Sequence, residues 1–135
     1  MILAGCVKEI SVEETVAAQE KITREEPEQP EEPARPSPRA LASLKLTDQG
    51  RRLIEAGEAD KAIQVLEQAI SLNPGNGQNY YYLSEAWLMK GFTAKARQFN
   101  RLAKSHLTDD KDWENLVTRQ AERITQLEEK IKKSR

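Results

Sequence analysis

The chain has 135 residues, of which 38% are hydrophobic, and its formal net charge is −1. This length is enough for one small domain, and the near-zero charge argues against a nucleic-acid partner, which calls for a strongly basic face. No apolar run approaches the length of a membrane span, and the single cysteine, Cys6, excludes an internal disulfide.

The first segment, residues 1–6, ends in Leu3-Ala4-Gly5-Cys6. This motif resembles the lipobox of bacterial lipoproteins, in which a small residue precedes a cysteine that becomes lipid-modified. The resemblance implies a lipid anchor on Cys6 and a place on a membrane of the cell envelope. A signal peptide also needs a basic region and an apolar region of about 7–15 residues, and only Met1 and Ile2 precede the motif. Two interpretations remain open: the true start lies upstream, or the match is accidental and the protein is cytoplasmic.

Residues 7–40 are predicted to form a disordered tether. Five of the six prolines and several glutamates lie in residues 25–38. Proline removes helix donors and the glutamates repel one another, so this stretch cannot collapse into a core. If Cys6 carries a lipid, the tether holds the following domain away from the membrane surface.

Residues 41–108 contain a sequence repeat with a period of 34 residues. The coincident small residues are Gly57 with Gly91, Ala62 with Ala96, and Ala69 with Ala103. A fixed period of this length is typical of stacked helical repeats. The pattern predicts four antiparallel helices, which cover residues 42–56, 59–72, 77–90 and 93–106.

This pattern resembles the tetratricopeptide repeat, whose motif has large and small residues at set positions. The resemblance implies an all-α fold in which small side chains lie where the two helices of a repeat cross, with Trp87 filling space between them. Gly57 and Gly91 suit tight turns that need a positive φ. The residues assigned to packing are Gly50, Ala62, Ala69, Ser84, Trp87, Ala96 and Ala103.

The second copy of the repeat departs from the family pattern in its latter half. Asn100 stands where a large apolar residue is expected, and neighbouring Phe99 can substitute for it. Thr108 replaces the closing proline that Pro74 supplies in the first copy. In the first copy, Gln49 stands in place of a leucine.

Residues 109–135 are predicted to form a capping helix over 109–134. Acidic residues crowd its start and lysines its end, which suits the helix dipole. An apolar stripe is expected to cover the last surface of the stack. The stripe comprises Trp113, Leu116, Val117, Ala121, Ile124, Leu127 and Ile131. The spacing of Val117, Gln120, Ile124, Leu127 and Ile131 also resembles a coiled-coil seam, so a homo-oligomer formed through this helix is an alternative.

The family resemblance implies that the first helix of each repeat lines a groove for a peptide. The first copy supplies Leu44, Thr47, Asp48, Arg51, Ile54 and Glu55; the second supplies Gln78, Tyr81, Tyr82, Glu85, Leu88 and Met89. Tyr81 and Tyr82 are the leading candidates, because tyrosine suits recognition surfaces. The alternative is that the C-terminal helix buries both tyrosines. Arg51 is the only basic residue among the twelve positions, which argues against a carboxylate clamp and for an apolar or mixed peptide.

Catalytic and cofactor signatures are absent from the sequence. No catalytic triad, metal-ligand spacing or nucleotide loop is found, so no cofactor and no metal are expected. His106, the only histidine, lies near a helix end and is interpreted as a cap. The resulting prediction is a non-enzymatic module that binds a protein or peptide, has no nucleic-acid partner, and contacts a membrane only through a lipid anchor.

Overall fold

The computed structural model describes residues 34–135, in which the compact unit Pro36–Arg135 is built from five helices. These are α2 (Pro38–Glu55), α3 (Ala59–Leu72), α4 (Gly77–Met89), α5 (Thr93–His106) and α6 (Lys111–Lys133). The all-α fold with two helical repeats and a C-terminal helix is thereby confirmed. Cys6 and the predicted tether up to residue 33 lie outside the described residues.

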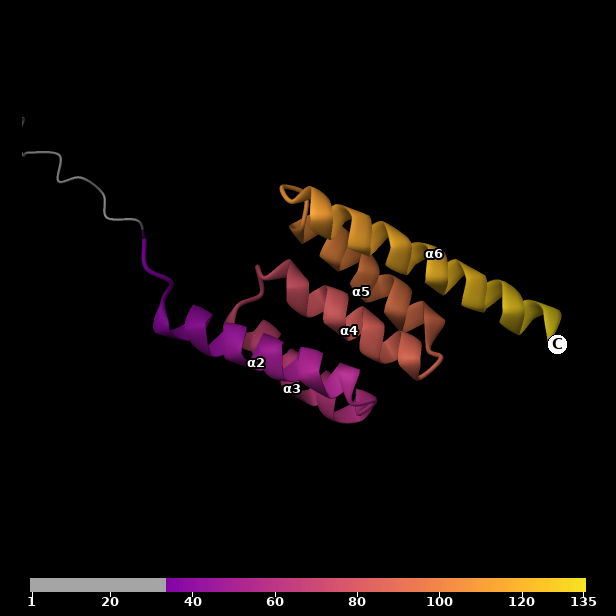
Figure 1. Ribbon diagram of the computed structural model, residues 1–135, viewed down its shortest axis with the longest axis horizontal. Coiled ribbons are helices and arrows are strands. Elements are labelled where there is room, and N and C mark those ends of the chain that lie inside the picture. The colour runs from indigo at the N-terminus through magenta and orange to yellow at the C-terminus, as the bar shows by residue number, and fades with distance from the viewer. Residues whose placement is uncertain (1–33) are drawn as a thin grey trace, which may run out of the picture. The chain divides into compact units, whose positions relative to one another are not determined.

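The helices form two layers (Figure 1). α2, α4 and α6 lie in a row on the near side of the view, and α3 and α5 lie behind them. α4 contacts α2, α3, α5 and α6, so it is the centre of the unit. None of the described helices is long and apolar enough to cross a membrane.

α2 begins four residues before the predicted start. The Ser37 hydroxyl accepts a hydrogen bond from the Ala40 amide at 3.1 Å, and Pro38 occupies the first helical turn. A serine cap satisfies a free helix amide, and proline is tolerated in the first turn because the amide it lacks has no helical partner. Residues 38–40, assigned to the tether from the sequence, are therefore part of α2.

The two intra-repeat turns have the backbone that the sequence predicts. Gly57 has φ +78° and Gly91 has φ +81°, and no other described residue has a positive φ. Only glycine adopts this region without a steric penalty. The turns therefore let α3 fold back along α2, and α5 fold back along α4.

Small residues allow close helix crossings. A Cβ at Gly50 would lie 2.5 Å from the Leu66 side chain. The Ser84 hydroxyl donates to the Ala96 carbonyl at 2.7 Å, where α4 crosses α5. Six of the seven packing residues proposed from the sequence are buried, namely Gly50, Ala62, Ala69, Ser84, Ala96 and Ala103, and Trp87 is partly buried.

Polar residues hold α6 against the rest of the unit. The Asn100 side chain is 5% exposed and donates to the Val117 carbonyl at 2.9 Å and to the Gln120 side chain at 3.0 Å. Gln120 in turn donates to the Tyr81 carbonyl at 3.0 Å. A buried polar group is costly unless it is hydrogen-bonded, so Asn100 requires α6 as its partner. Asn100, which stands where the repeat pattern has a large apolar residue, thus helps to hold α6 in place.

Candidate protein-binding face

The candidate site is the surface formed by α2, α4 and α6, which we call the three-helix face. α2 contacts α4 and α4 contacts α6, whereas α2 and α6 do not touch. The three helices therefore lie in a row with α4 in the middle (Figure 1). Side chains from helices that are distant in sequence meet on this face.

Three aromatic rings form the centre of the face. The Trp113 ring lies 5.4 Å from the Tyr81 ring and 6.1 Å from the Tyr82 ring, both in T-shaped arrangements. Both tyrosines are partly buried, and burial is the main cause that raises the pKa of each phenol. The two hydroxyl groups are therefore neutral hydrogen-bonding groups at physiological pH. Aromatic pairs in this geometry add about 0.5–1.5 kcal/mol beyond area burial.

The C-terminal helix covers Tyr81 and Tyr82 only in part. Tyr81 packs against the buried cluster that contains Val117 of α6, and Tyr82 packs against the central core cluster. Both side chains nevertheless keep part of their surface exposed. α6 therefore supports these rings from one side and does not cover them completely.

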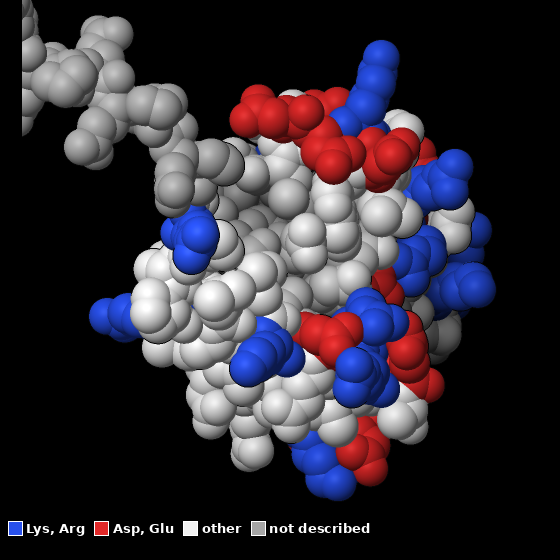
Figure 2. All heavy atoms as spheres, turned by 60° about the vertical axis from the view of Figure 1, so that its left-hand side comes forward, with Lys and Arg blue, Asp and Glu red and all other residues white. Residues whose placement is uncertain are grey.

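Exposed leucines lie on the outer helices of the face. On α2, Leu41 is 47% exposed and Leu44 is 46% exposed, and on α6, Leu116 is 38% exposed. Figure 2 views the end of the unit at which α2, α4 and α6 begin, and uncharged surface lies in its middle between acidic side chains at the top and mixed charges at the lower right. The middle of this end therefore carries few charged side chains.

Ion pairs occupy the α2 side of the face. Arg51 lies 2.7 Å from the Asp48 carboxylate and 2.6 Å from the Glu55 carboxylate. The hydrogen bond from Arg51 is the main cause that lowers the pKa of Asp48. Arg51 is thus neutralised within its own helix, which leaves little charge to attract an anionic peptide end.

Glu85 of α4 is engaged by α6. Its side chain is 16% exposed, forms an ion pair with Arg123, and accepts a hydrogen bond from Gln120 at 2.8 Å. The hydrogen bond to Glu85 is the main cause that raises the pKa of Arg123. Because the Glu85 carboxylate is already paired with two residues of α6, it stabilises the position of α6 and has little remaining capacity to bind a ligand.

Two of the predicted groove residues belong to the interior. Thr47 is 4% exposed, and its hydroxyl lies 2.5 Å from the Asn79 side chain of α4. Ile54 packs against the central core cluster. Thr47 and Ile54 lie on the side of α2 that faces α4 and α3, because a helix turns 100° per residue and only one stripe can face outward.

The three remaining groove residues predicted on α4 differ in how much of their surface is exposed. Gln78 and Leu88 are partly buried, and Met89 is 46% exposed near the far end of α4. Met89 lies beside the turn at Gly57, where it lines a shallow cavity of about 420 Å³. It is therefore separated along α4 from the aromatic centre.

Leu116 and Trp113 of the predicted packing stripe differ in their surroundings. Trp113 is partly buried and packs beside the tyrosines, whereas Leu116 is exposed and belongs to the face. Extending the 34-residue period by one further step places Asp48 on Tyr82 and Tyr82 on Leu116. That step would have identified Leu116 as a face residue, because α6 occupies the place of a third first-helix.

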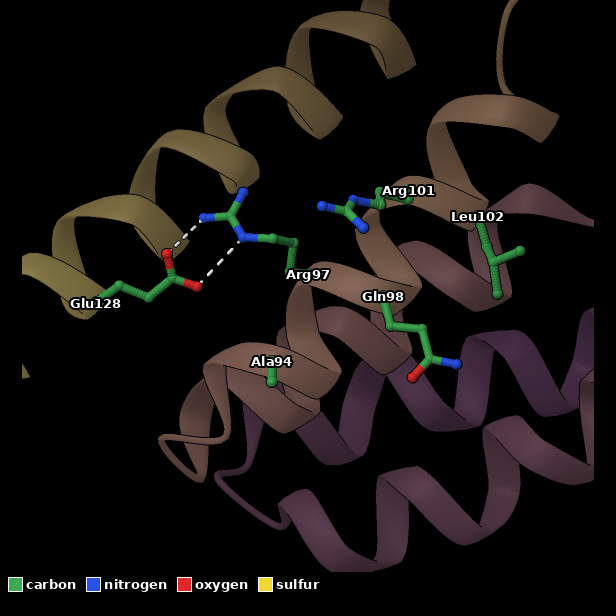
Figure 3. Close-up of a pocket in the computed structure, with 6 residues that line it drawn as sticks. All are labelled: Ala94, Arg97, Gln98, Arg101, Leu102 and Glu128. Atoms are coloured by element: carbon green, nitrogen blue, oxygen red, sulfur yellow. Dashed lines mark hydrogen bonds and ion pairs between the residues drawn. The ribbon is translucent and has the colours of Figure 1, made fainter.

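A separate hollow of about 570 Å³ lies between α5 and α6, away from the three-helix face (Figure 3). Arg97 in this hollow is bound through two nitrogens to Glu128, at 2.8 and 3.2 Å. Arg101, also in the hollow, forms no ion pair within residues 34–135. The hollow therefore contains one guanidinium group, that of Arg101, without an ion-pair partner among the described residues. This single positive charge is little for binding an anion.

Possible metal ligands and the single histidine were located in the part of the chain that the structure describes. No group of three or more potential metal ligands occurs among residues 34–135. His106 is exposed and stacks on the Tyr80 ring, with centroids 5.1 Å apart.

Comparison with models of protein families gives a match for part of the chain. Residues 53–119 match the model of the family described as tetratricopeptide repeat, and the match begins within α2 and ends within α6. No curated protein and no solved structure matches the chain.

Proposed function

Residues 53–119 match the model of the tetratricopeptide repeat family, and from this premise we propose that the protein is a non-enzymatic interaction module that binds a protein or peptide on the three-helix face. Repeats of this family generally mediate contacts between proteins. The partner segment is apolar or of mixed charge. In this proposal the module acts as a scaffold, as repeats of this family generally do.

The exposed leucines around the aromatic rings carry this proposal. Leu44 and Leu116 leave 46% and 38% of their surface in water, and they lie on α2 and α6, the two helices on either side of α4 in the face. Covering a large apolar side chain contributes about 1.5–3 kcal/mol. Contiguous exposed apolar surface rimmed by polar residues is typical of interaction sites.

The substitution Leu116→Glu tests the proposal. A charge at this position would have to be desolvated by the partner, so partner binding should fall about tenfold or more. Affinity capture from cells of the source organism, with quantitative mass spectrometry, measures the loss. Leu102→Glu is the matched control, because Leu102 is 37% exposed but lies on α5, away from the face. Equal retention of every partner by both variants would contradict the proposal.

A lipid on Cys6 is the second part of the proposed function. The lipobox-like Leu3-Ala4-Gly5-Cys6 and the proline- and glutamate-rich stretch behind it support presentation of the module from a membrane of the cell envelope. Metabolic labelling with a fatty-acid analogue should mark the wild-type protein and leave Cys6→Ala unmarked. Recovery of unlabelled wild-type protein in the cytoplasmic fraction would favour the alternative, a soluble cytoplasmic location.

A further inference from the structure

We propose that the segment bound on the three-helix face is an amphipathic α-helix, whose uncharged apolar stripe lies along α4 between Leu44 and Leu116. This inference rests on the proposed function and names the partner class for the same face. It is carried by two observations: the positions of the exposed apolar side chains, and the pairing of the polar groups around them.

The width of the face suits a helix. Packed helices have axes about 8–10 Å apart, so α2 and α6, which both contact α4 and do not contact each other, are about 16–20 Å apart. A helix with its side chains is about 10–12 Å wide. Placed over α4, it reaches Leu44 on one side and Leu116 on the other.

The polar groups of the face are already engaged with each other. Arg51 is paired with Asp48 and Glu55, and Glu85 is paired with Arg123 and Gln120. An extended peptide needs hydrogen-bond partners for its backbone groups when it is buried. A helix satisfies these groups internally, so it can cover the face without breaking the existing pairs.

Arg119 favours a partner helix that carries a negative charge. It lies one turn after Leu116 on α6, is exposed, and forms no ion pair with residues 34–135. The 34-residue period relates Arg51 to Glu85 and Glu85 to Arg119, so Arg119 occupies the equivalent position on the third helix of the face. The partner helix therefore carries an acidic residue on the flank that faces α6.

Three fluorescein-labelled peptides of about four turns test the inference. The first has leucines at helical spacing and one glutamate flank, the second is its scrambled sequence, and the third has two central prolines. Each is titrated by fluorescence anisotropy against the full chain carrying Cys6→Ala, which prevents intermolecular disulfides. The host variants are Leu116→Glu and Arg119→Glu, with Leu102→Glu and Lys104→Glu as matched controls on α5.

The expected result is that the first peptide alone binds and gains helical circular dichroism in the complex. Leu116→Glu should weaken its binding about tenfold or more and Arg119→Glu severalfold, with the α5 controls unchanged. Leu116-dependent binding of the proline peptide, equal to that of the first, would overturn the helical partner and leave the proposed function standing. Absence of binding by the first peptide, or binding insensitive to Leu116→Glu, also overturns the inference. The proposed function fails separately, if cellular partners are retained equally by Leu116→Glu and Leu102→Glu.

Discussion

Glycine residues at helix contacts set how closely the helices of this protein approach. Gly50 brings α2 against Leu66 of α3, and Gly77 brings the start of α4 against Leu107, where an added Cβ would lie 2.5 Å from the Leu107 side chain. Gly77 is the buried first residue of α4, at the position where the sequence predicts this helix to begin. The absence of a side chain at these two positions is therefore a packing requirement.

We expect Gly50→Ala to destabilise the protein by about 1–2 kcal/mol. The new methyl group overlaps the fully buried Leu66, and overpacking costs about 1–3 kcal/mol, partly offset by the better helix propensity of alanine. Urea unfolding followed by circular dichroism measures the change. Gly75→Ala is the control, because its Cβ would meet no atom closer than 3.6 Å. A variant at position 50 as stable as the wild type would show that Leu66 can move aside at no cost.

At the scale of the element, α6 is attached by polar contacts at several levels along its length. Asn100 and Gln120 form its buried link, and Arg97 and Glu128 form a two-point ion pair near its end. Such contacts favour one register of α6 over others, because a shifted helix would leave buried amides without partners. The orientation of α6 in turn places Trp113 beside the tyrosines and leaves Leu116 exposed.

The Arg97–Glu128 pair predicts a pH-dependent part of the stability. The hydrogen bond from Arg97 is the main cause that lowers the pKa of Glu128 from its ordinary 4.5. The folded pKa is therefore below the unfolded one, so the stabilisation is complete above pH 4.5 and is lost as the pH falls through the lowered value. Glu128→Gln should reduce the unfolding free energy by about 0.5–1 kcal/mol at neutral pH.

Urea titrations of wild type and Glu128→Gln over a series of decreasing pH values measure this effect. The difference in unfolding free energy between wild type and Glu128→Gln should become smaller as the pH falls below 4.5, and at lower pH it should vanish. Glu129→Gln, which removes a neighbouring carboxylate with no ion pair among the described residues, should show no comparable difference. A gap between wild type and Glu128→Gln that stays constant with pH would contradict the assigned role of the pair.

At the scale of the whole molecule, α6 completes the helical stack. Val117, Gln120 and Ile124, the first three residues of the predicted coiled-coil seam, are buried within the chain itself. Only Leu127 and Ile131 remain, and both are partly buried. A seam this short exposes too little apolar surface for a stable helix pair, since isolated coiled coils depend on several heptads.

The full chain carrying Cys6→Ala is therefore expected to sediment as a monomer at both low and high protein concentration. Analytical ultracentrifugation measures this directly. The double variant Leu127→Glu with Ile131→Glu should sediment identically. A concentration-dependent dimer that these two changes abolish would instead support assembly through the C-terminal helix.

The 34-residue period and the turn glycines indicate the four repeat helices from the sequence alone. These signals are local, because Gly57 and Gly91 need a positive φ whatever lies far away in the chain. For this reason the predicted helices α3 and α5 agree with the structure residue for residue. The caps at Ser37 and Asp110 are equally local but were not used to predict helix starts from the sequence, so the starts of α2 and α6 differ from the predicted ones.

Only the tertiary structure decides which side of each helix is buried against a distant helix. Thr47 is interior because Asn79 meets it from another helix, and Leu116 is exposed because Asn100 and Gln120 set the rotation of α6 about its axis. A rotation of one residue, 100°, exchanges a buried position for an exposed one. The three-helix face depends on these long-range contacts. The helices that form it were therefore predictable from the sequence, whereas the residues exposed on it were not.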